Sequence, residues 1–219
     1  MTQQLSLFDP PPVSSAKPAH LPPGLRYQAD LISAQEETRL VGQIQALPFE
    51  PFAFHGFFGH RRVVSFGWRY DFARRLLERV DPIPEFLLPL RRQVASFTGH
   101  DPEAFMQVLV LEYRPGAGIG WHRDRQQFED IAGVSLLSAC PFRLRRRRAQ
   151  GWERATLSTS PRSAYLLQGP ARTDWEHSIA PVEALRYSVT LRTFRQAELD
   201  GQPINASSGS GRVVGADKG

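Results

Sequence analysis

Apolar residues recur at helical spacing in one stretch of the chain, over residues 33–47. Ser33 and Glu36 have the S-x-x-E spacing of a capping box, in which each side chain satisfies a backbone N–H of the other residue. A single apolar stripe follows, formed by Leu40, Val41, Ile44 and Leu47. The pattern predicts an amphipathic helix that begins at Ser33 and turns this stripe toward a core.

A second apolar stripe predicts a helix from Pro84 to Phe97, with Gly99 as its stop signal. Its core-facing residues are expected to be Phe86, Leu87, Leu90 and Val94. A further short helix is expected over residues 72–80.

From Phe105 onward the pattern changes to short β-like segments between glycine, proline and polar breaks. Strands are predicted near residues 107–113, 119–124, 132–138, 142–147, 154–158, 163–168, 175–179 and 185–194. Many short strands without intervening helices favour a sandwich or jelly roll over βαβ units. The two earlier helices should pack against the outside of one sheet, which gives a mainly β fold with flanking helices, of the α+β class.

Both ends of the chain lack this periodicity. Residues 1–24 hold six of the 18 prolines, and residues 198–219 are rich in glycine and serine, so both are expected to be disordered tails around a domain over 25–197. No apolar run approaches the ~20 residues of a membrane span, and no signal-peptide pattern opens the chain. The single cysteine, Cys140, excludes an intrachain disulfide and is expected to be a buried small hydrophobe. We expect a cytoplasmic monomer without membrane contact.

Charge adds one hint about partners. The formal net charge is +5, and 25 of the 27 basic residues are arginines, since Lys17 and Lys218 are the two lysines. Arginine forms bidentate pairs with phosphate and carboxylate, so the excess suits a nucleic-acid partner. A genome whose composition favours arginine explains the excess equally well.

A candidate metal site begins at His122-x-Asp124. Two residues apart on a strand, these side chains emerge on the same face and can bind one metal. A His-x-acid pair alone is expected about once by chance in a chain with six histidines, so a second histidine matters. His177 lies between the apolar Trp175 and Ile179, which turn it toward the interior. Two histidines and one carboxylate form the facial triad of non-haem Fe(II) oxygenases.

The last predicted strand carries a polar face opposite a core face. Its polar residues are Arg186, Ser188, Thr190 and Arg192, which alternate with Tyr187, Val189 and Leu191. Arginines inside a barrel need an anion or carboxylates. Fe(II) oxygenases use a dicarboxylate co-substrate, which is a natural partner for an interior arginine. A salt bridge to an acid at the barrel rim is the alternative for each arginine.

Together these motifs resemble the signature of the AlkB-type 2-oxoglutarate- and Fe(II)-dependent dioxygenases. Tyr113–Ala117 is similar to the family's Y-x-P-G-x segment, and Val134–Leu137 and Leu167–Pro170 resemble two further segments. The resemblance covers residues 100–195 strongly and 25–99 loosely. It implies a distorted double-stranded β-helix, a jelly-roll variant.

The resemblance also implies the site. Its ligands for Fe(II) would be His122, Asp124 and His177, and its residues for 2-oxoglutarate would be Tyr113, Arg186, Arg192 and Ser188, with O2 as the further reactant. Met106 and Leu111 stand where the family often has Asn, and Ser188 where a longer amide is common. Leu111 cannot donate a hydrogen bond, so co-substrate binding should depend more on Tyr113 and the arginines.

The family places a base-binding lid at about residues 45–75, which here are rich in Phe, Gly, His and Arg. Aromatic rings stack on bases and arginines pair with phosphates. The substrate contacts expected from the lid and from the flanks of His-x-Asp are Phe57, Phe58, Arg61, Arg62, Trp121 and Arg125. Packing of the lid phenylalanines in the core is the alternative, and Trp68 and Tyr70 are expected to pack in the core.

Two segments lie outside this scheme. Arg143 and Arg145–Arg148 form a basic run on a predicted strand, where one face is solvated or contacts phosphate. The pentapeptide Gln4-Leu5-Ser6-Leu7-Phe8 is similar to the motif with which bacterial repair proteins dock on the DNA polymerase sliding clamp. If it does so, it favours DNA as the substrate; a chance peptide that packs on its own domain is the alternative.

The function implied by the resemblance is oxidative demethylation of N-alkylated bases, such as 1-methyladenine or 3-methylcytosine, in DNA or in RNA. Formaldehyde and succinate would be released. The base must be flipped out or single-stranded to reach the iron. Two other functions stay open: an oxygenase acting on protein side chains or a small molecule, and a non-catalytic nucleic-acid- or clamp-binding module.

Overall fold

The computed structural model describes residues 21–54, 57–71, 74 and 76–195, without the side chains of residues 53–60. The sliding-clamp-like pentapeptide, Gln4–Phe8, lies outside the described residues. Residues 21–24, expected to be part of the tail, belong to the folded domain. The carbonyls of Pro23 and Gly24 accept hydrogen bonds from the amides of Ala171 and Gln168, at 2.9 and 3.0 Å.

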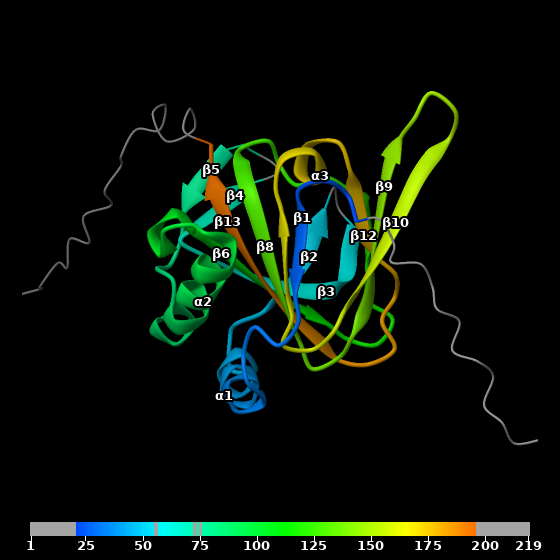
Figure 1. Ribbon diagram of the computed structural model, residues 1–219. Helices are drawn as coiled ribbons and strands as arrows, with labels where there is room; N and C mark the ends of the chain where they lie inside the picture. Colours follow the sequence, from blue (N-terminus) through cyan, green and yellow to red (C-terminus); the bar gives the residue numbers. More distant parts are fainter. Residues whose placement is uncertain (1–20, 55–56, 72–73, 75, 196–219) are drawn as a thin grey trace, which may run out of the picture.

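Two antiparallel sheets, of seven and four strands, form the body of the described domain (Figure 1). In spatial order the large sheet contains β1 (Leu25–Gln28), β11 (Ala164–Leu167), β8 (Phe128–Leu136), β13 (Arg186–Phe194), β6 (Gln107–Tyr113), β3 (Phe57–Phe66) and β2 (Glu50–Phe54). The small sheet contains β10 (Trp152–Thr159), β9 (Cys140–Arg147), β12 (Glu176–Ile179) and β7 (Ile119–His122). One core cluster joins them, with Leu111 and Ile131 from the large sheet and Phe142, Leu144 and Ile179 from the small one. This is the predicted jelly-roll arrangement.

Two helices cover the outer face of the large sheet, as predicted. They are α1 (Ala34–Ile44) and α2 (Leu88–Thr98), which follows the 3-10 turn η1 (Glu85–Leu87), and both lie on the same side of the sheet in Figure 1. Ile44, Leu90 and Val94 share a buried cluster with Val110 of β6 and Val189 of β13. Burial of each such side chain contributes roughly 1.5–3 kcal/mol, so packing on the sheet stabilises these short helices.

The local signals at the helix ends are confirmed. The Ser33 hydroxyl accepts from the Glu36 amide at 3.2 Å, and the Ser33 amide donates to the Glu36 carboxylate at 2.8 Å. Gly99 ends α2 with a φ of 79°, a left-handed conformation that glycine adopts without steric cost.

The helix expected over residues 72–80 is wrong. The structure has a two-stranded sheet there, β4 (Trp68–Asp71) and β5 (Leu76–Arg79), in which Arg69 and Glu78 are cross-strand partners. Leu77 is the buried residue of β5, and its neighbours on the strand are more exposed. Strand pairing with β4 overrides the helical propensity of these residues.

Most predicted strands match to within a few residues, but β1, β2 and β3 were not predicted as strands. Two short elements complete the described fold, the 3-10 turn η2 (Pro102–Ala104) and α3 (Gly169–Thr173). Cys140 is a buried free cysteine, as expected. None of the described helices has the length and hydropathy needed to cross a membrane.

Candidate active site

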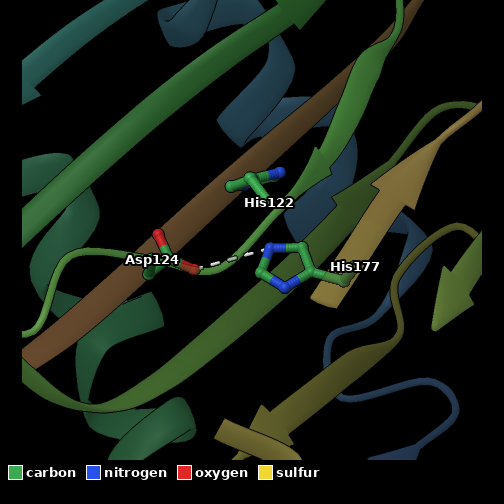
Figure 2. Close-up of side chains that lie close together, drawn as sticks. All are labelled: His122, Asp124 and His177. Atoms are coloured by element: carbon green, nitrogen blue, oxygen red, sulfur yellow. Dashed lines mark ion pairs between the residues drawn. The ribbon is translucent and has the colours of Figure 1, made fainter. Parts of the chain in front are cut away.

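Strand pairing in the small sheet brings two histidines together. His177 of β12 lies directly opposite His122 of β7, and their ring centroids are 4.2 Å apart. Asp124 follows β7 by two residues, and its carboxylate approaches Nε2 of His177 at 3.5 Å (Figure 2). One ligand atom from each of the three residues lies within 4.8 Å of the other two. The residues predicted as a triad therefore converge on one point.

Asp124 and His177 hold the protonation states that a divalent metal needs. Burial and the neighbouring His122 lower the pKa of His177 to about 3, so its imidazole is neutral at physiological pH. Burial acts to raise the pKa of Asp124, but the charges around it, of which Arg192 is the largest, together outweigh burial and hold that pKa well below its usual range. Nδ1 of His122 contacts the carbonyl of Gly120 at 2.9 Å. Since a carbonyl can only accept, Nδ1 carries the proton and Nε2 remains free to bind a metal.

Arg192 holds the carboxylate ligand in place. Its Nη2 donates to Oδ1 of Asp124 at 2.8 Å, and its Nη1 donates to Oε1 of Gln107 at 2.9 Å. The side chains of Arg192 and Asp124 are 9% and 10% exposed, so this is a buried ion pair. The prediction that Arg192 helps to bind the dicarboxylate stays a prediction, because its hydrogen bonds here go to Asp124 and Gln107.

Arg186 supplies a buried cation with unused donors. It is 1% exposed, and its Nη2 donates to the Ser135 hydroxyl at 2.8 Å. Its Nε and Nη1 have no hydrogen-bond partner among the described residues. A buried guanidinium with unpaired donors is costly unless an anion completes it. The donor set therefore fits a carboxylate of 2-oxoglutarate, as the His-Asp-His set fits Fe(II).

Three polar side chains form a row across the large sheet on the same face. Tyr113 of β6 is the register partner of both Arg61 of β3 and Arg186 of β13. Burial raises the pKa of Tyr113, although Arg186 and Arg61 oppose the shift, so its phenol stays protonated. Ser188 is buried two residues after Arg186, on the same face of β13.

Comparison with known proteins agrees with this geometry. The family model of the 2OG-Fe(II) oxygenase superfamily matches residues 25–208. The chain belongs to this superfamily. Its relatives include an Arabidopsis thaliana protein named alkylated DNA repair protein ALKBH8 homolog, 28% identical over 80% of this chain and 56% of that protein. Another is the mouse tRNA (carboxymethyluridine(34)-5-O)-methyltransferase ALKBH8, 28% identical over 74% of this chain and 25% of that protein.

Solved structures share the fold of this AlkB-type oxygenase. OsALKBH1 superposes with a TM-score of 0.63 at 14% identity, over 80% of this chain and all of that one. A prolyl-4-hydroxylase from Pseudomonas putida superposes with a TM-score of 0.53 at 14% identity, over 79% and 93% of the two chains. These likenesses confirm the double-stranded β-helix. The cofactor and co-substrates of the superfamily are Fe(II), 2-oxoglutarate and O2, so the chain is an oxidoreductase. The chain spans little more than half of the first relative.

The predicted lid residues of this AlkB-type chain have different surroundings. Phe57 and Phe58 lie on β3, but their side chains are outside the described residues. Arg61 is 9% exposed, lies over the Phe52 ring at 3.9 Å, and its Nε has no partner among the described residues. Arg62 forms a bidentate ion pair with Glu112, both bonds 2.8 Å long. Arg61 therefore has one unpaired donor, Nε, near the site, whereas Arg62 is bound to Glu112.

The two substrate contacts predicted beside His-x-Asp, Trp121 and Arg125, also have different surroundings. Trp121 lies on the outer face of the small sheet, where Arg145 stacks on it at 4.4 Å. Arg125 lies over the ring of Tyr70 at 4.7 Å, next to the loop that carries Asp124. Trp68 and Tyr70 pack on the small buried cluster formed by Leu77, Phe128 and Phe194, as expected.

Sequence reasoning missed three polar residues that support the site. Gln107 and Ser135 bind Arg192 and Arg186, as described above. Arg172 of α3 is buried, and its Nη2 donates to the carbonyls of Arg125 and Phe128 at 2.6 and 2.9 Å. It therefore ties down the loop that follows Asp124. Spacing gives no signal for Arg172, because its partners are backbone atoms more than 40 positions away.

Proposed function

We propose that this chain oxidatively demethylates N-alkylated nucleobases of the 1-methyladenine and 3-methylcytosine type in DNA, at single-stranded or flipped-out positions. The observation that carries the proposal is the convergence of His122, Asp124 and His177 at the small sheet, together with the unpaired donors of the buried Arg186 on the large sheet. The name of the Arabidopsis relative, an alkylated DNA repair protein homolog, supports an alkylated nucleic acid as substrate.

Fe(II), when bound with 2-oxoglutarate and O2, supplies oxidation of the N-methyl group to a hydroxymethyl group, which leaves as formaldehyde, while 2-oxoglutarate becomes succinate and CO2. The protein's own contribution is binding and orientation. Asp124, held by Arg192, and the imidazoles of His122 and His177 would provide the three protein ligands for Fe(II). Arg186 and Tyr113 are placed to bind the co-substrate carboxylate.

Buried apolar side chains form one wall of the site. Phe142 packs 5.2 Å from His177, ring centroid to centroid, and is 1% exposed. The cluster around it, which includes Leu144 and Ile131, consists of buried apolar side chains. Electrostatic interactions strengthen in such surroundings, which favours the ion pair between Arg192 and Asp124.

DNA is the polynucleotide that we favour. The sequence Gln4–Phe8 resembles a sliding-clamp contact, which would hold the enzyme near DNA and raise its local concentration there. The mouse relative is named for a tRNA modification, so RNA is the second candidate.

The experiment that tests the proposal uses two oligonucleotides of one sequence, one DNA and one RNA, each with a single 1-methyladenine. Protein loaded with Fe(II) is given 2-oxoglutarate and O2, and the mass of the base and formaldehyde are followed, with His122→Ala as control. We expect loss of one CH2 unit from the DNA base and none with the variant. Faster reaction of the RNA would assign RNA as substrate. Succinate formation with both bases unchanged would reject a nucleobase substrate and favour a protein or small molecule.

A further inference from the structure

The outer face of the small sheet, opposite the metal site, is both basic and aromatic. We call it the basic face, and it consists of Trp121 on β7, Arg143, Arg145 and Arg147 on β9, and Trp152 and Arg154 on β10. Arg147 pairs with Trp152 across the strands, and Arg145 pairs with Arg154. The alternate residues of β9, Phe142 and Leu144, are buried in the core, so the arginines between them point outward.

The cations of the basic face exceed the anions beside it. Nε of Arg145 contacts the Glu176 carboxylate at 2.7 Å, and Nε of Arg143 donates to the Ser178 hydroxyl at 3.1 Å. Arg147 and Arg154 are exposed, and neither pairs with a carboxylate among the described residues. Four guanidinium groups thus stand against one carboxylate. Such a surplus of one sign, held together by the fold, attracts a polyanion.

Stacking fixes the guanidinium groups in place. The guanidinium carbon of Arg145 lies 4.4 Å from the Trp121 ring centroid and 4.1 Å from that of Trp152. Arg143 also lies over Trp121, at 5.3 Å, and Arg147 over Trp152, at 5.4 Å. Because arginines occupy these ring faces, bases do not stack on them. Stacking leaves the edge of a guanidinium group accessible, and the N–H donors there, other than the bound Nε atoms of Arg143 and Arg145, match phosphate oxygens.

We propose that the basic face binds the phosphodiester backbone of the single-stranded polynucleotide that carries the target base. From β10 to β7 the face crosses three strand spacings, or ~14 Å, which suits repeated phosphates along a strand better than one small anion. The basic face ends on β7, at Trp121. The next residue of that strand, His122, points to the opposite side of the sheet, where the metal site lies. A strand lying across the face therefore arrives at the edge of the active site. This inference rests on the proposed function for the identity of the strand.

The test measures binding rather than turnover. A fluorescent oligo-dT, which has no secondary structure, is titrated with the full chain at several salt concentrations and followed by anisotropy. The variant is Arg147→Gln with Arg154→Gln, at two exposed residues that make no ion pair among those described. The control is Arg39→Gln with Arg92→Gln, which removes the same charge from exposed positions on α1 and α2.

Each phosphate contact on a single strand adds about 0.7 to the slope of log affinity against log salt concentration. Loss of two contacts should therefore lower the slope by about 1.4 and weaken binding roughly 20-fold at 0.1 M salt. The double Arg→Lys variant should restore most of the slope, because it keeps the charges. The control pair should change neither slope nor affinity by a comparable amount.

Three results would overturn the inference. The first is that the Arg147→Gln, Arg154→Gln variant binds oligo-dT with the wild-type salt slope. The second is that the control pair loses as much affinity for oligo-dT as this variant does, which would show a general effect of net charge. The third is tight binding of an acidic polypeptide such as polyglutamate, with no binding of oligo-dT, which would assign the face to a protein. The two proposals can also fail separately. If oligo-dT binding depends on Arg147 and Arg154 but the protein demethylates no base, the basic face is a polynucleotide-binding surface and the proposed function is rejected.

Discussion

Replacement of Arg186 by methionine should stabilise the ligand-free protein and abolish useful binding of 2-oxoglutarate. Arg186 is 1% exposed, and two of its three guanidinium nitrogens lack a partner among the described residues. Methionine has a similar length and no charge. Exchange of a buried ion pair for apolar residues of similar volume is often stabilising, by about 1–4 kcal/mol, and we expect a gain of this order for Arg186. Loss of the contact with the Tyr113 ring, at 5.2 Å, offsets ~0.5–2 kcal/mol of that gain.

The effect on the co-substrate follows from the same unpaired donors. Two hydrogen bonds from a guanidinium to a carboxylate contribute about 1.5–3 kcal/mol each, so their loss should weaken 2-oxoglutarate binding roughly 100- to 10,000-fold. Urea unfolding with and without 2-oxoglutarate, with Mn(II) in place of Fe(II) to prevent turnover, measures both effects. Calorimetry gives the dissociation constant directly.

The matched control is Arg91→Met. Arg91 of α2 is another buried arginine with an unpartnered Nε, and it forms an ion pair with Glu103 at 2.9 Å, away from the site. This variant should bind 2-oxoglutarate as the wild type does. The reasoning is refuted if Arg186→Met is less stable than the wild type without ligand and is still stabilised by 2-oxoglutarate to the same extent.

Three further outcomes are expected. Arg192→Met should weaken metal binding about 10- to 100-fold in a Mn(II) titration, because Asp124 loses the hydrogen-bond donor that orients it. An unchanged affinity for Mn(II) would show that Asp124 needs no such support. The metal-free protein should lose stability as the pH falls from about 6.5 toward 3: the pKa of His177 is about 3 when folded, so in this window the unfolded state binds more protons. His177→Phe should flatten that part of the stability–pH curve, and an unchanged curve would contradict the assignment. Arg61→Met should raise KM for the oligonucleotide roughly 10- to 100-fold and leave KM for 2-oxoglutarate unchanged, whereas the opposite pattern would assign Arg61 to the co-substrate.

The sequence predicts those parts of the site that depend on local periodicity. His122 and Asp124 lie two residues apart beside one strand, and the alternation in β13 separates Arg186 and Arg192 from the core residues between them. The convergence of His177 with His122 needs the pairing of β12 with β7, which spacing alone does not reveal. The resemblance to a known family supplied that step.

Elements that depend on tertiary partners were harder to predict. The segment over 72–80 has a helical composition, yet β5 pairs with β4 instead. β1 is too short to stand out, and it exists as an edge strand because β11 provides its partner. Likewise, the role of Arg192 depends on the carboxylate that the fold brings near it, and here that carboxylate is Asp124.

The most direct test of the central claim is one reaction. Anaerobically prepared protein is mixed with Fe(II), 2-oxoglutarate, O2 and a single-stranded oligodeoxynucleotide that contains 1-methyladenine, and the base is analysed by mass. The account predicts adenine, with formaldehyde and succinate formed in equal amounts, and no conversion by His122→Ala. An unchanged base, with protein that binds both metal and 2-oxoglutarate, would contradict it.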